Sequence, residues 1–115
     1  MTIQVADIVD ELCITYEDGE ALLARLRPAL VNSDPVTVDF EGTRLHMSPF
    51  FNASIAALLK DYSREDLREK LHIRNLPGQA VQTLIRCLDV GEKYFHNPAY
   101  QQALDNAVEQ VEAEA

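Results

Sequence analysis

The chain has 115 residues, a formal charge of −9 and a sequence pI of about 4.6. This length suffices for one hydrophobic core and is too short for two, so we expect a single domain over residues 1–115. The acidic surface disfavours binding to nucleic acid phosphates and to anionic lipids. The basic residues between 60 and 74 alternate with acids, which is typical of a solvated helix face. Nothing in the composition excludes a homodimer.

Residues 1–17 contain two short strand-forming runs, "TIQVADIV" at 2–9 and "LCITY" at 12–16. The pattern leaves open whether they form a hairpin or one bent strand. The chain start lacks a basic region followed by an apolar run, and no apolar stretch approaches the roughly 20 residues of a membrane span. We therefore expect a cytoplasmic protein. Cys13 and Cys87 lack metal-ligand spacing, which predicts buried free thiols.

Residues 18–95 carry the elements of the expected core. Leucines at helical spacing predict a helix from about residue 19, which Pro28 is expected to kink or end near Arg27. "VTVDF" at 36–40 is the clearest strand, and "TRLHM" at 43–47 is a second short extended run.

Ser48 and Pro49 are residue types preferred at the N-cap and first position of a helix. An apolar stripe follows at Phe51, Ile55, Leu58 and Leu59. Ser63 with Asp66 resembles a capping box and predicts another short helix.

"LHIRNL" at 71–76 predicts a strand, and residues 81–95 predict the next helix. Asn97-Pro98 breaks the chain direction before a final helix over 98–115, whose acidic end from Asp105 is expected to fray. Strands separated by helices imply an α/β fold, with a small mixed sheet, helices packed against it and a C-terminal helix.

Residues with catalytic chemistry are present but poorly spaced. Ser48, His46 and Asp39 could supply a nucleophile, a base and an acid, but no glycine-flanked elbow surrounds the serine. The three histidines are scattered and the glycines form no phosphate-binding loop. We therefore expect no enzyme, no metal and no cofactor, which leaves a binding or regulatory module.

The segment "VTVDFEGTRLHMSPFFNASIAALL" at 36–59 resembles the central part of the STAS superfamily, the fold of bacterial anti-sigma-factor antagonists and of sulphate-transporter cytoplasmic domains. It is more similar to uncharacterised bacterial STAS-like proteins. They share its "V-x-x-DF-E-G" strand, a serine followed by an aromatic, and a downstream "hydrophobic-x-N-L", here Ile73 to Leu76. The resemblance covers roughly residues 18 to 95 and implies a STAS-like fold.

In antagonists, a strand ending in Asp leads to an Asp-Ser-Ser-Gly motif, whose first serine is phosphorylated by a partner kinase. The resemblance matches Asp39 to the strand-end acid and Ser48 to the phosphoacceptor. Met47, Pro49 and Phe50 replace the other motif residues. These departures disfavour phosphorylation and favour Ser48 as a helix cap, with Phe50 as an exposed or half-exposed aromatic anchor.

The sequence thus predicts a non-enzymatic, regulatory protein–protein interaction module similar to anti-sigma-factor antagonists. It would dock a partner, which the resemblance implies to be a GHKL-type ATPase kinase, through the helix start at Ser48–Asn52. The candidate residues are Asp39, Ser48, Pro49, Phe50 and Asn52. The alternative is an acidic inhibitor or defence-related protein, which would occupy a basic groove of another macromolecule with its negative first half.

Overall fold

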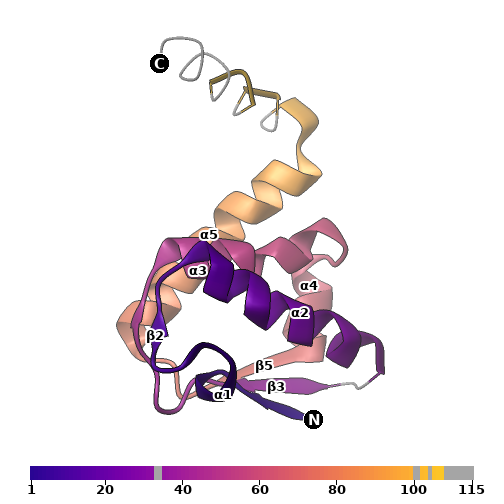
Figure 1. The fold of residues 1–115 in the computed structure, drawn as a ribbon. Coiled ribbons are helices and arrows are strands. Elements are labelled where there is room, and N and C mark those ends of the chain that lie inside the picture. The colour runs from indigo at the N-terminus through magenta and orange to yellow at the C-terminus, as the bar shows by residue number, and fades with distance from the viewer. Residues whose placement is uncertain (33–34, 100–101, 104, 108–115) are drawn as a thin grey trace.

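The computed structural model describes residues 1–32, 35–99, 102–103 and 105–107. Its centre is a three-stranded sheet in the order β1-β3-β5. The strands are β1 (Thr2–Gln4), β3 (Val36–Asp39) and β5 (Leu71–Arg74). The predicted strand at 36–40 is therefore the central strand of this sheet. The α/β class is confirmed (Figure 1).

Every strand pair in the described part of the chain is parallel, so the expectation of a mixed sheet was wrong. Thr2 pairs with Thr37, and Thr37 pairs with His72. A second pair joins β2 (Leu12–Cys13) to β4 (Arg44–His46), also in parallel. Helical segments separate β1, β3 and β5 and return the chain to the same end of the sheet, which is the connection that parallel strands require.

The two N-terminal strands form neither a hairpin nor one bent strand. The helix α1 (Ala6–Val9) separates β1 from β2, and the two strands belong to different sheets. β1 is an edge strand of the central sheet, so the first residues are part of the same fold as the core that follows.

Helices cover one face of the central sheet. The helices α2 (Tyr16–Asn32), α3 (Ser48–Ala53), α4 (Arg64–Lys70) and α5 (Gly78–His96) lie on the same side of the strands (Figure 1). Ile3, Val38 and Leu71 are buried, whereas their neighbours Gln4 and His72 are exposed. This alternation follows from the two-residue period of a strand and gives a polar outer face.

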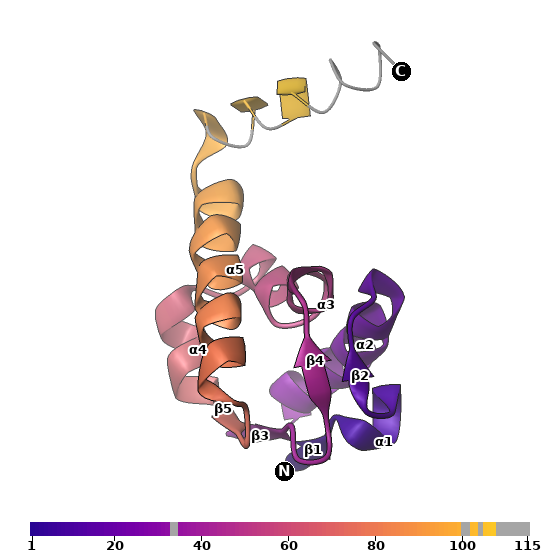
Figure 2. The same ribbon diagram turned by 90° about the vertical axis from the view of Figure 1, so that its left-hand side faces the viewer.

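In Figure 2, β4 lies between α5 on one side and β2 with α2 on the other.

α2 is longer than the sequence pattern predicts. It begins at Tyr16, where the Thr15 Oγ1 accepts a hydrogen bond of 3.1 Å from the Asp18 N–H, and it continues to Asn32. Pro28 lies inside it, on the exposed side. A proline removes one helical hydrogen bond. Burial of Leu26 and Leu30 on the opposite side holds the last turns of the helix against the core, which is why the expected end near Arg27 is not observed.

The apolar stripe after Ser48 is buried as predicted, but it spans two helices. The chain turns at Ser54, whose Oγ donates to the Phe50 carbonyl oxygen at 2.8 Å, and continues as the 3₁₀ helix η1 (Ala56–Lys60). This turn within the apolar stripe lets two short helices, α3 and η1, fill the space above the sheet.

The capping signal at Ser63 is confirmed, because its Oγ accepts a hydrogen bond from the Asp66 N–H at 3.0 Å at the start of α4.

α5 begins at Gly78, three residues before the predicted start. Beyond it, residues 98–99, 102–103 and 105–107 are helical, as expected for the C-terminal helix, and the rest of the acidic end that begins at Asp105, residues 108–115, lies outside the described residues. Among the described residues, no helix combines the length and apolar character needed to cross a membrane. The cytoplasmic location remains a prediction.

Candidate functional site

Asp39 is buried at the carboxyl end of β3, with 8% of its surface exposed. Its carboxylate accepts hydrogen bonds from the Asn75 Nδ2 at 2.8 Å, from the Glu41 N–H at 3.0 Å and from the Gln4 Nε2 at 3.5 Å. The bond from Asn75, followed by that from the Glu41 N–H, lowers the pKa of this carboxyl below its ordinary value. Asp39 therefore joins the ends of all three central strands.

Asn75 links two of the motifs that carry the family resemblance. It follows β5 and has a φ of 59°, in the left-handed region that asparagine tolerates better than most residues. In this conformation, the side-chain amide of Asn75 donates its hydrogen bond to the Asp39 carboxylate. The "D-F" and "N-L" motifs, 36 residues apart in the sequence, thus meet at one end of the sheet. None of the hydrogen bonds recorded for Asp39 involves residues 48 to 52.

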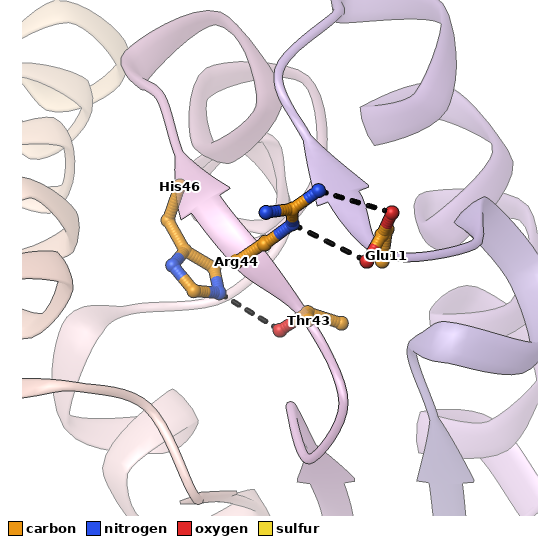
Figure 3. Close-up of polar contacts among 4 residues, drawn as sticks. All are labelled: Glu11, Thr43, Arg44 and His46. Atoms are coloured by element: carbon orange, nitrogen blue, oxygen red, sulfur yellow. Dashed lines mark hydrogen bonds and ion pairs between the residues drawn. The ribbon is translucent and has the colours of Figure 1, made fainter.

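His46 is held by the connector between β3 and α3 (Figure 3). Its Nε2 lies 2.8 Å from the Thr43 Oγ1, which also lies 2.5 Å from the Phe40 carbonyl oxygen. The His46 ring stacks on Phe51 with an interplanar angle of 11°. Burial lowers the pKa of His46, which favours the neutral imidazole.

The side chains of Asp39, His46 and Ser48 do not form the triad that can be written from the sequence. The hydrogen bonds recorded for Asp39 come from Asn75, Glu41 and Gln4, and the Nε2 of His46 contacts Thr43. In the described part of the chain, no group of three His, Cys, Asp or Glu side chains could hold a metal ion. The hydrogen bonds of Asp39 and of the His46 Nε2 thus connect these two side chains to residues other than Ser48.

The start of α3 differs by one residue from the predicted cap. Met47 has the extended conformation of an N-cap residue, with φ −109° and ψ 155°, and Ser48 and Pro49 are the first two helical residues. No side-chain capping hydrogen bond forms there. Ser48 and Pro49 are exposed, so both side chains are accessible to a partner.

Phe50 is fully buried, so the prediction of an exposed or half-exposed anchor was wrong. Its ring meets Phe51 edge to face, with the ring centroids 5.8 Å apart. Both aromatic residues are buried because α3 packs against α2 as well as α5, so more than one side of this short helix faces the core. Phe50 contributes to the core and cannot serve as a surface anchor.

A groove lies beside Ser48, between β4 and the first turns of α5. It has a volume of about 410 Å³. Two side chains at its edge are strongly exposed although they are apolar: Leu45 at 58% and Met47 at 49%. Leu45 has a φ of 56°, which interrupts the regular alternation of the strand. The residues that line the groove are Thr43, Arg44, Leu45, His46, Met47, Pro77, Gln79, Ala80 and Thr83.

The sequence reasoning missed Leu45 and Met47. No regular strand pattern could have identified them, because Leu45 has a φ of 56° and Met47 lies beyond the end of β4. Asn52, predicted as part of the same site, is exposed one turn later and lines a different hollow with Ala56 and residues of α5. The structure thus groups Leu45, Met47, Ser48 and Pro49, hereafter the Leu45–Pro49 surface.

Two further contacts lie beside this surface. The Cys87 thiol of α5 lies 3.9 Å from the Ser48 carbonyl oxygen, and Arg44 forms an ion pair of 3.2 Å with Glu11 (Figure 3). Burial raises the pKa of the Cys87 thiol. Both cysteines are buried and free of a disulfide bond, as the sequence predicts.

Comparison with known families supports the resemblance in the sequence. The model of a family described as "STAS-like domain of unknown function (DUF4325)" matches residues 18–79, which include the Leu45–Pro49 surface, Asp39 and Asn75. This match ends before most of α5, whereas the resemblance was expected to reach about residue 95. Comparisons with curated proteins and with solved structures gave no significant match. Because the match spans more than half of the chain, this protein belongs to the STAS-like domain family.

Proposed function

We propose that this protein is a regulatory module that binds another protein through the Leu45–Pro49 surface. One observation carries the proposal: Leu45 and Met47 are strongly exposed beside the accessible Ser48, at the edge of a groove. Exposed apolar side chains next to a hollow are typical of interaction sites. The fold of the family is compatible with a regulatory role.

The partner that we propose is a GHKL-type ATPase kinase, by analogy with anti-sigma-factor antagonists. This part of the proposal rests on the fold resemblance, which is an analogy and not a property of the site. Ser48 has the exposure that a kinase substrate requires. A phosphate there would add about −1.5 to −2 charge directly beside Met47 and would alter a docked interface.

The test measures the affinity of the purified protein for GHKL-type ATPases encoded in the same genome, using titration calorimetry. Met47→Ala should weaken binding about tenfold, because a central apolar side chain of an interface contributes of the order of 1–2 kcal/mol. Val31→Ala is the matched control, since Val31 is an exposed apolar residue at the end of α2. Equal affinities of Met47→Ala and Val31→Ala would contradict the site.

Salt dependence distinguishes this proposal from the acidic-inhibitor alternative. Docking through apolar side chains should change little between low and high salt, whereas binding through the acids of the first half should weaken steeply. Asn52→Ala then measures how far the contact extends along α3. Phe50→Ala is unsuitable as a probe of binding, because Phe50 is part of the core.

A further inference from the structure

A second hollow lies on the other side of α5, between α4, β5 and α5, and has an apolar floor with a basic rim. Ile55, Leu67 and Leu84 are buried at its base. Both charged residues that line it are arginines, Arg64 and Arg68. The complete lining is Ile55, Arg64, Leu67, Arg68, Leu71, Ile73, Leu84 and Leu88. We refer to it as the arginine-rimmed pocket.

The size of the arginine-rimmed pocket suits a small molecule. Its volume is about 220 Å³. An apolar cavity of about 150 Å³ takes up benzene, so the pocket has room for about nine non-hydrogen atoms. Six of its eight lining residues are leucine or isoleucine, which selects an aliphatic body for the ligand.

The charge of the rim selects an anionic head group. The chain contains nineteen Asp and Glu residues against ten Lys and Arg, yet the charged residues lining this pocket are basic. Arg64 is paired with Asp89, whereas the side chain of Arg68 has no hydrogen-bond or ion-pair partner within the described residues. The guanidinium group of Arg68 thus has donors available, and its planar fork matches the two oxygens of a carboxylate.

We propose that the arginine-rimmed pocket binds a small aliphatic monocarboxylate of about six to eight carbons. The chain of the ligand lies against Leu67, Leu84 and Leu88, and its carboxylate contacts Arg68 at the open side. The pocket shares no lining residue with the β4–α5 groove. The proposal is therefore independent of partner binding at the Leu45–Pro49 surface and can fail or succeed separately.

The experiment is an NMR titration of the full ¹⁵N-labelled chain with octanoate, and with 1-octanol as the uncharged analogue. Octanoate should shift the backbone amide signals of Leu67, Leu84 and Leu88, and it should bind about fivefold tighter than octanol, the ratio expected from a well-placed ion pair at a partly exposed site. Arg68→Gln should remove this preference. Arg25→Gln, which makes the same charge change on the exposed side of α2, should retain it.

Three results would overturn the proposal. The first is equal affinity for octanoate and octanol, which would leave the arginines without a role in recognition. The second is an equal loss of octanoate affinity in Arg25→Gln and Arg68→Gln, which would show that the loss comes from the change in net charge and not from a contact with Arg68. The third is unchanged octanoate binding in Leu88→Phe, because a larger side chain at this half-buried position should fill the pocket.

Discussion

Gly19 gives the sharpest test of how α2 packs on α3. It lies in the first turn of α2, and a Cβ atom added there would lie 2.7 Å from the Cβ of Ala53 and closer still to the Phe50 carbonyl oxygen. Helix propensity alone would favour Gly19→Ala by up to about 1 kcal/mol. Overpacking costs about 1–3 kcal/mol, and a backbone oxygen cannot rotate away as a side chain can. Taking the upper end of this range less the gain in helix propensity, we expect a net loss of about 2 kcal/mol in the free energy of unfolding.

Urea denaturation followed by circular dichroism measures this loss. With a slope of about 2 kcal/mol per molar urea, the midpoint should fall by about 1 M. Gly91→Ala is the matched control, because the atom nearest to a Cβ added at this helical glycine is a side-chain carbon, the Leu59 Cδ1 at 3.1 Å, and its substitution should cost less than that of Gly19. A Gly19→Ala variant as stable as the native protein, or more stable, would refute the close contact between the two helices.

The remaining predictions concern the core, the sheet end and the thiols. Phe50→Ala should lower the free energy of unfolding by about 3–5 kcal/mol, and a native-like urea midpoint would show that Phe50 is not a core residue. The Asp39 carboxyl has a lowered pKa when folded, so its contribution to stability is complete above its unfolded pKa and is lost as the pH falls through the folded value. Asn75→Gly keeps the backbone conformation but removes the hydrogen bond to Asp39, so this variant should lose less stability than the native protein below about pH 4. An unchanged dependence of the free energy of unfolding on pH would show that Asn75 does not lower the pKa of Asp39. Burial raises the pKa of Cys13 to about 11, so a thiol reagent should label it at neutral pH only after unfolding.

The sequence was sufficient for features that depend on local pattern. The alternation in "VTVDF" predicted the central strand, and Ser63 with Asp66 predicted the start of α4, because both signals act within a few residues. The STAS-like resemblance predicted the family, which the match over residues 18–79 confirms. These predictions needed no knowledge of which helix packs on which.

The missed features depend on contacts between distant segments. Pro28 was expected to kink or end its helix near Arg27, and the helix does not end there, because burial of the neighbouring leucines outweighs the lost hydrogen bond. The burial of Phe50 depends on α2 and α5 lying against α3, which no periodicity within α3 reveals. The joining of Asp39 to Asn75 likewise requires the parallel register of β3 and β5.

The parallel order of the central sheet has a consequence for folding kinetics. Residue 2 pairs with residue 37 and residue 36 with residue 71, so each pairing closes a loop of about 35 residues. No hairpin exists in the described part of the chain that could form first and act as a template. The entropy of loop closure is therefore lost before strand contacts compensate for it, which slows folding. The backbone hydrogen bonds of α2 close within four residues, so we expect this helix to form before the sheet assembles.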